Sequence, residues 1–229
     1  MKSARQTAFE ILNKIQRDGS YSNLALDAVL DKSNIDTKEK KLASALVYGV
    51  IERRITLDYN IGLYLSQPLK KLKPQALTTL RIGAYQILFM DKIPDSAAVN
   101  ESVTLVKKNG AAFAGGLVNA VLRKIAANGL KTDGSMSVKF SAPEWLCEMW
   151  EKSYGTENAE KILEASFGAV ETVLRVNTGK TDSNDLIELL SSEGFEAEEN
   201  QTAADSLVLK SGGAVHKTNC YKKGLFHVQ

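Results

Sequence analysis

Residues 80–108 read LRIGAYQILFMDKIPDSAAVNESVTLVKK, and this stretch decides the fold. Its apolar residues recur at the three- and four-residue spacing of one helical face, on both sides of Asp95 and Ser96: Leu80, Ala84 and Leu88, then Val99, Val103 and Val106. Asp95 and Ser96 are good N-caps, and Gly110 is well placed to end the second helix. The stretch therefore predicts two amphipathic helices joined by a short loop.

The same periodicity extends outward through the first 130 residues. Asp36 and Glu39 form a capping-box pattern, and Pro74 suits the first position of a helix. We predict about seven helices and no strand before residue 130, with helices over 3–17, around 24–29, and over 36–54, 57–65, 74–88, 95–110 and 118–129. Short connections between them predict a compact all-α domain.

Composition is that of an ordinary globular protein. The 229 residues are 44% hydrophobic and 24% charged, with only 4 prolines, which excludes a wholly disordered or collagen-like chain. No apolar run approaches the roughly 18 residues of a membrane span, and no signal-peptide segment follows Met1. Cys147 and Cys220 cannot form a disulfide framework or a four-ligand zinc site. We therefore expect a cytoplasmic protein with no membrane partner and no metal.

Charge divides the chain. Residues 1–130 hold 19 Lys and Arg against 11 Asp and Glu, a net charge of +8, whereas residues 131–229 hold 10 against 16, a net charge of −6. A basic half favours polyanions, since each Lys or Arg that meets a phosphate releases counterions. The alternative is that +8 is only the charge of a soluble surface.

The basic residues of the first half occur in small groups. Cations in the last turn of a helix complement its dipole, which is a sufficient reason for Lys107-Lys108 and Arg123-Lys124. It does not account for the loop before Pro74, nor for Arg81, which is either a phosphate contact or a buried partner of Glu52 or Glu101. The candidate phosphate-binding residues are Arg5, Arg53, Arg54, Lys70, Lys71, Lys73, Arg81, Lys107, Lys108, Arg123 and Lys124.

The second half changes character after a polar linker at 131–137. A helix opens around 141–146, with Leu146, Trp145, Met149 and Trp150 as its apolar side, and a second runs over 157–167. Alternation predicts a strand over 172–177, a helix over 183–192 follows, and strands are expected over 195–199 and 206–210. Leu225, Phe226 and Val228 form a strand-like stretch at the end, from which we expect the natural chain to continue. The order predicts a small α+β unit with an antiparallel sheet.

Motifs of catalysis are missing from the sequence. It contains no Walker loop, no dinucleotide-binding glycine pattern and no nucleophile elbow. Cys220 and His216 make a conceivable nucleophile pair, but a small apolar filler and a surface histidine are the better interpretation. Cys147 is interpreted as core, and the glutamates of 196–199 as a solvated acidic face.

Residues 80–108, together with GLVNAVLRK at 116–124, resemble the signature of the NusB-like domain over residues 3–128. Two groups carry that domain: the free-standing antitermination factor NusB, which binds RNA with a ribosomal protein, and the bacterial rRNA cytosine-C5 methyltransferases of the RsmB/Sun/Fmu family. The continuation resembles the second group, with SAPEWL at 141–146, LRVNT at 174–178, Gly194-Phe195 and GLFHVQ at 224–229 in the same order.

This resemblance implies a mainly α protein: a NusB-like RNA-binding bundle over 1–130, connector helices over 131–169, and a small RRM-like α+β unit over 170–229. In that family an S-adenosylmethionine-binding Rossmann domain with two cysteines follows, one of which attacks C6 of the target cytosine. Neither Cys147 nor Cys220 matches those cysteines, so we assign no catalytic or cofactor-binding residue here. Arg175 and Asn177 belong to a family motif and join the candidate RNA-binding residues.

The expected function is the targeting portion of an S-adenosylmethionine-dependent 16S rRNA methyltransferase, inactive alone, whose partners are small-subunit rRNA and, as a further candidate, a ribosomal protein. No DNA partner is expected. The alternatives are a free-standing NusB-type antitermination factor and a helical protein-interaction module without a nucleic-acid partner.

Overall fold

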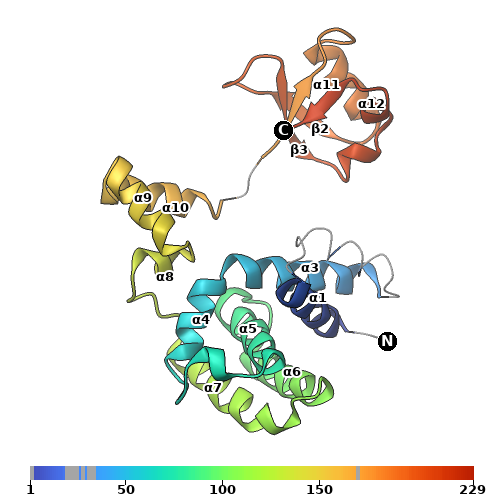
Figure 1. Ribbon diagram of the computed structural model, residues 1–229. Helices are drawn as coiled ribbons and strands as arrows, with labels where there is room; N and C mark the ends of the chain where they lie inside the picture. Colours follow the sequence, from blue (N-terminus) through green and yellow to red (C-terminus); the bar gives the residue numbers. More distant parts are fainter. Residues whose placement is uncertain (1–2, 19–25, 27–28, 30–34, 169–170) are drawn as a thin grey trace. The chain divides into compact units, whose positions relative to one another are not determined.

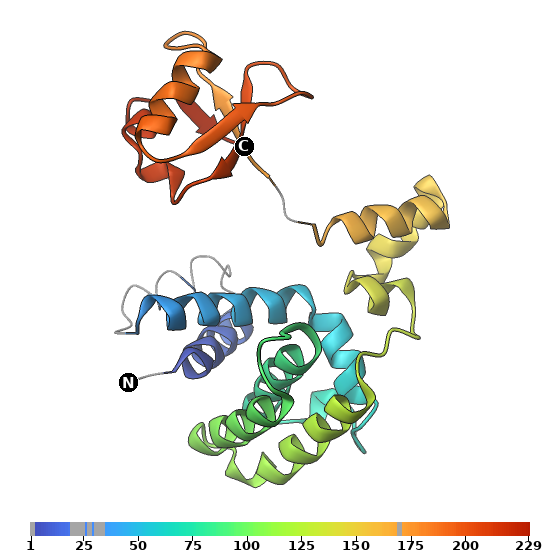
Figure 2. The ribbon, with the colours of Figure 1, turned by 180° about the vertical axis from the view of Figure 1, so that it is seen from behind.

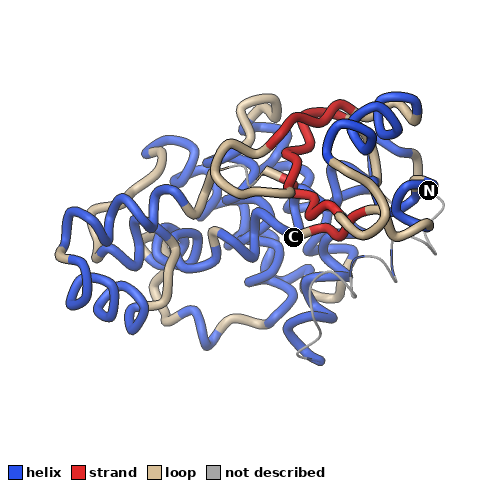
Figure 3. The backbone as a smooth tube through the Cα atoms, turned by 90° about the horizontal axis from the view of Figure 1, so that it is seen from above, coloured by secondary structure: helices blue, strands red, loops and turns tan. Residues whose placement is uncertain are grey.

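The computed structural model describes residues 3–18, 26, 29, 35–168 and 171–229. The chain divides into two compact units, Met1–Ser166 and Phe167–Gln229. In the described residues, strands occur only in the second unit, as Figure 3 shows. A mainly α protein with a small antiparallel sheet at its C-terminal end is therefore confirmed.

The first unit begins with a helical bundle. Its helices are α1 (Ala4–Asp18), α3 (Thr37–Glu52), α4 (Arg54–Gly62), α5 (Pro74–Phe89), α6 (Asp95–Lys108) and α7 (Gly115–Asn128). Helices α5, α6 and α7 pack side by side (Figures 1 and 2). Their apolar stripes meet in one core, in which Ile11, Leu46, Leu80 and Leu122 are fully buried. The predicted short helix around 24–29 lies largely outside the described residues.

The starts of α3 and α6 lie close to where the sequence predicts them, but two of the predicted capping interactions differ. The Asp36 carboxylate accepts from the Glu39 N–H at 2.8 Å, as the capping box predicts. The second hydrogen bond of the capping box, from the Asp36 N–H to the Glu39 carboxylate, was predicted wrongly. The Glu39 carboxylate instead accepts from the N–H of Ala4 at the start of α1. Asp95 and Ser96 are not N-caps either: Pro94 takes that position in an extended conformation, and Asp95 lies in the first turn, where its charge favours the helix dipole.

Three short helices complete the first unit: α8 (Met136–Phe140), α9 (Glu144–Tyr154) and α10 (Thr156–Ala165). The predicted polar linker 131–137 therefore ends early. Ser141 does not open a helix but ends α8 in the left-handed conformation, with φ of 50°. The predicted apolar side of α9 is wrong at Trp145, which is 64% exposed, and at Met149, which is also exposed. Leu146 and Trp150 are half-buried, and Cys147 is buried as expected.

The second unit is a four-stranded antiparallel sheet with helices on one face. Strands β1 (Thr172–Val176), β2 (Glu196–Glu199), β3 (Ser206–Ser211) and β4 (Phe226–Val228) lie in the order β2-β3-β1-β4. Leu174 and Val176 pack with Leu186 and Leu190 of α11 (Ser183–Ser192) into a second core, which confirms the predicted alternation along β1.

Cys220 lies in this second core on α12 (Asn219–Lys222), where it is buried among apolar side chains. His216 is exposed, in agreement with the interpretation of a surface histidine. Glu196, Glu198 and Glu199 are exposed, and Glu198 forms an ion pair with Lys210 at 2.8 Å. The finer division of the chain at residues 130 and 169 stays a prediction.

Candidate nucleic-acid interface

Arg5 and Lys108 are brought together at the start of α1. The Arg5 Nε donates to the Gln86 Oε1 of α5 at 2.7 Å, which fixes the guanidinium across the bundle. Both cations line a cavity of about 450 Å³ that Glu10 and Glu101 also line. The carboxylates reduce the positive potential here, so this group is a mixed-charge site and not a purely basic patch.

Arg53 lies on an aromatic stack. Its guanidinium carbon is 5.1 Å from the centre of the Phe89 ring, and Phe89 stacks on Tyr85 with centroids 5.6 Å apart. Burial, followed by the charge of Glu52, raises the pKa of the Tyr85 hydroxyl above its ordinary value. A planar cation on a ring is the arrangement on which a nucleic-acid base can stack further.

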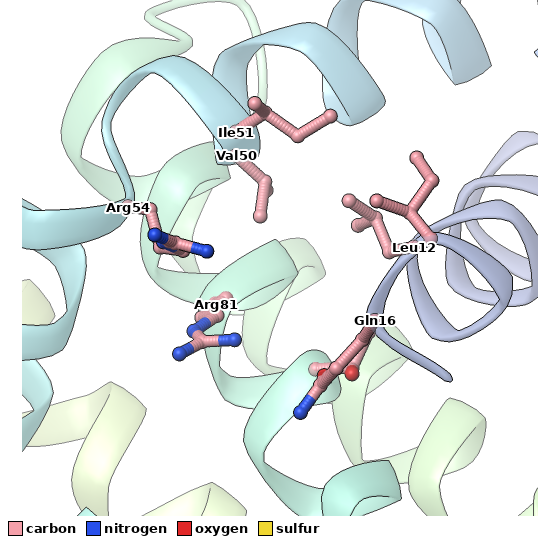
Figure 4. A pocket seen from close by; sticks show the side chains of 8 residues that line it. Leu12, Gln16, Val50, Ile51, Arg54 and Arg81 are labelled. Atoms are coloured by element: carbon pink, nitrogen blue, oxygen red, sulfur yellow. The ribbon is translucent and has the colours of Figure 1, made fainter. Parts of the chain in front are cut away.

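Arg54 and Arg81 lie on one side of a second cavity, shown in Figure 4. Arg81 is paired with neither of the two expected glutamates. Its Nε and Nη2 donate to Oδ1 and Oδ2 of Asp58, both at 2.7 Å, in a two-pronged ion pair between α5 and α4. This geometry gives Arg81 a structural partner and leaves Arg54 as the exposed cation of the pair.

Lys70, Lys71 and Lys73 are exposed in the turn between α4 and α5, around the 3-10 segment η1 (Leu69–Lys71). The turn is attached to the bundle because Leu69 and Leu72, which alternate with the lysines, pack against the main core. None of the three ammonium groups makes an ion pair within the described ranges. Among the described residues of the first unit, the turn is therefore a dense group of unpaired cations.

The remaining candidate cations of the first unit lie on α6 and α7. Lys107 lies in the last turn of α6 and passes over Gly115, with Cε 3.1 Å from where a β-carbon of that glycine would be. The helix-end interpretation was wrong for Arg123 and Lys124, because α7 continues to Asn128. Arg123 donates to Asn119 Oδ1 at 3.2 Å, and Lys124 is exposed.

In the second unit, Arg175 is exposed on β1, beside His227 of β4 in the sheet register. Asn177 is engaged in the fold: its Nδ2 donates to the Gly224 carbonyl at 2.9 Å, and its N–H donates to the Leu225 carbonyl at 2.8 Å. Asn177 therefore holds the segment that leads into β4.

Within the first unit the candidate residues thus belong to several local groups, and which of the candidates touch RNA stays a prediction. Sequence reasoning missed Gln16 and Thr78, which line the cavity of Arg54 and Arg81, and the pairing of Arg81 with Asp58. No local pattern marks these residues, because they come from three helices that meet only in the folded chain.

Neither cysteine shows the features of a nucleophile. Burial raises the pKa of both thiols, that of Cys220 to about 11, and Cys220 Sγ donates to Glu193 Oε1 at 3.1 Å. Within the described ranges, no group of three or more His, Cys, Asp or Glu side chains is placed to hold a metal ion. None of the helices described is long and apolar enough to cross a membrane.

Comparison with known proteins agrees with this architecture. Residues 2–127 match the NusB family, and residues 142–216 match the ferredoxin-like domain of the RsmF/B-like methyltransferases. A helical bundle with cationic groups, followed by a ferredoxin-like unit, defines a NusB-type protein with an appended α+β domain. The chain belongs to the NusB family, and its continuation is that of the RsmB/Sun group of that family.

Three similar proteins illustrate this assignment. A probable ribosomal RNA small subunit methyltransferase B of Bacillus subtilis is 33% identical over 99% of this chain and 52% of its own length. The crystal structure of PH0851 aligns with 100% of this chain and 53% of its own, with a TM-score of 0.68 and 17% identity, and so shows the fold alone. NusB in its complex with NusE and dsRNA aligns with 54% of this chain and 93% of its own, with a TM-score of 0.50 and 27% identity. The chain spans about half the length of the methyltransferase relative.

Proposed function

We propose that this chain is the RNA-binding portion of an S-adenosylmethionine-dependent methyltransferase that modifies C5 of a cytosine in small-subunit rRNA in the cytoplasm. The observation that carries the proposal is the order of two matches on one chain, the NusB family first and the RsmF/B-like ferredoxin-like domain second. The Bacillus subtilis relative, which extends over 99% of this chain, supports the same assignment.

In this proposal the first unit holds the RNA by its phosphates. Lys70, Lys71 and Lys73 are exposed, unpaired in the described ranges and carried by a turn anchored in the core, which suits contacts to a polyanionic backbone. Cofactor binding and methyl transfer are assigned to the half of the relatives that this chain does not align with. The NusB complex with NusE supports a protein, of the ribosomal kind expected above, as a second partner of the bundle.

A free-standing antitermination factor is the alternative. NusB in the solved complex corresponds to only 54% of this chain, so the ferredoxin-like match at 142–216 has no counterpart in it. That observation favours the methyltransferase. A pure protein-interaction module would not need the unpaired lysines of the turn.

The test is binding of the 229-residue chain to transcribed small-subunit rRNA and to a large-subunit rRNA fragment of equal length, followed by titration with S-adenosylmethionine. We expect tighter binding to the small-subunit RNA and no heat of cofactor binding. Equal affinity for both RNAs would contradict the assignment to small-subunit rRNA, and failure to bind either RNA would overturn the proposal.

A further inference from the structure

A cavity of about 310 Å³ lies between α1, α3 and α5. Most of its wall is apolar, formed by Leu12, Ile15, Val50 and Ile51. Figure 4 shows Arg54 and Arg81 on one side and Leu12 and Gln16 on the other. The volume falls within the range of about 300–1,000 Å³ that is typical of ligand pockets, and the combination of apolar walls with a few converging polar groups is typical as well.

The polar groups of the cavity differ in what already binds them. Arg81 is held by Asp58 through Nε and Nη2, so the donors of its Nη1 group remain and the guanidinium plane is fixed. The side chains of Gln16 and Arg54 form no hydrogen bond or ion pair with any residue that the structure describes. The cavity therefore offers a pre-oriented donor, an amide without a partner and one exposed cation.

The matching ligand has a flat body, hydrogen-bonding groups along its edge and an adjoining negative charge. An unpaired nucleotide has all three, whereas an apolar peptide side chain would leave the Arg81 donors and Gln16 without partners. A base in a duplex cannot enter, because its edge and faces are occupied by pairing and stacking. Thr78 also lines the cavity, and its Oγ1 is already engaged, because it donates to Asn13 Oδ1 at 3.1 Å.

We infer that this cavity takes one unpaired nucleotide of the bound RNA, with the base between the apolar side chains and Gln16, and its phosphate on Arg54. The inference rests on the proposed function and adds to it a preference for single-stranded RNA. Arg81 and Asp58 act as one fixed unit in this site: the arginine presents its remaining donors to the base edge, and the aspartate sets their direction.

The experiment measures fluorescence anisotropy of the 229-residue chain with two probes, a labelled 12-nucleotide single-stranded RNA of random sequence and a 12-base-pair RNA duplex. Gln16→Leu removes the amide at nearly constant volume, Ile51→Phe partly fills the cavity, and Arg54→Ala removes the cation. Matched controls are Gln201→Leu, exposed in the second unit, and Lys41→Ala, exposed on α3 away from the cavity. Circular dichroism verifies that each variant is folded.

We expect Gln16→Leu and Ile51→Phe to weaken single-stranded binding about tenfold, the effect of one lost hydrogen bond to the ligand or of exclusion of the base, with duplex binding unchanged. Arg54→Ala should weaken single-stranded binding and flatten its salt slope by about 0.7, one phosphate contact. Because Gln16 and Arg54 are exposed, their variants should fold even if Ile51→Phe does not.

Two results would overturn the inference, and they are distinguishable. If the wild-type chain binds RNA and all three cavity variants bind the single strand like the controls, the cavity is not a nucleotide site, while the proposed function stands. If the wild-type chain binds neither probe, the inference and the proposed function fall together.

Discussion

Asn60 of α4 and Lys131 exchange two hydrogen bonds: the Asn60 Nδ2 donates to the Lys131 carbonyl, and the Lys131 N–H donates to the Asn60 Oδ1, both at 2.9 Å. Two further contacts extend this attachment, because the Thr56 Oγ1 donates to the Val138 carbonyl at 2.6 Å and the Ile55 N–H donates to the Ser141 Oγ at 3.1 Å. The segment that leads from the bundle to the connector helices is thus fastened along α4.

Replacing Asn60 by Ala should therefore destabilise this attachment. Asn60 is fully buried, and its loss leaves the N–H and carbonyl of Lys131 without their partners, a cost of about 1–3 kcal/mol. Urea unfolding measures the change, and hydrogen exchange should show faster exchange of the Lys131 amide. Asn128→Ala is the control, since its side chain is exposed and bonds only within α7. Equal stability of the two variants would contradict this account.

The Arg81–Asp58 pair predicts an asymmetric result. Asp58→Ala leaves the Arg81 cation, whose side chain is only 15% exposed, without its carboxylate, so we expect a loss of about 2–4 kcal/mol. Adding Arg81→Met to that variant should recover part of the loss. The Lys161–Glu157 pair is exposed, and Glu157→Ala should change the free energy of unfolding by less than about 0.5 kcal/mol. A double variant no more stable than Asp58→Ala alone would show that the pair is not the cause.

Gly49 and Gly116 make a matched pair of glycine positions. A β-carbon on Gly49 would lie 1.9 Å from the ring of Tyr85, whereas one on Gly116 would meet nothing within 4 Å. Gly49→Ala should destabilise the bundle by about 1–3 kcal/mol through overpacking, and Gly116→Ala should stabilise it by up to about 1 kcal/mol. Thermal denaturation measures both, and a Gly49→Ala variant as stable as wild type would refute the close approach of α3 and Tyr85.

Glu193 makes the stability of the second unit depend on pH in the acidic range. Its carboxylate accepts from the N–H groups of Asn219 and Cys220 at 2.8 and 3.2 Å, and these bonds hold its pKa below the ordinary value of 4.5. A lowered pKa in the folded state contributes stability above pH 4.5, and this contribution is lost as the pH falls through the lower folded value. Glu193→Gln should flatten the stability profile in that acidic range. An unchanged profile would remove Glu193 as the cause.

Local sequence chemistry predicted the helices and strands well, because periodicity and caps act within one turn. Asp182 caps α11 by accepting from the Asp185 N–H at 2.9 Å, and the predicted range 183–192 is the observed one. Two of the errors arise where a residue far away in the sequence supplies the hydrogen-bond partner. Glu39 bonds to Ala4 and Ser141 bonds to Ile55, each more than thirty residues away.

The candidate site was less predictable than the fold for the same reason. Charge along the sequence identified the basic residues, but not that Arg81 is paired with Asp58 or that Asn177 holds the Gly224 carbonyl. Hydropathy also does not predict which apolar side chains are buried in the core: Trp145 is apolar, but it is exposed. Which cations lie next to one another depends on how the helices pack, and the sequence alone does not show this.

The central claim, that the first unit binds rRNA through its phosphates, is tested most directly by the salt dependence of RNA affinity. For about six phosphate contacts on single-stranded RNA, the slope of log affinity against log salt should be about −4 to −5. Replacing Lys70, Lys71 and Lys73 together by Ala should flatten it by about 2, while Lys152→Ala and Lys161→Ala on the connector helices should not. An affinity that does not change with salt, or a slope that the loop substitutions leave unchanged, would contradict the account.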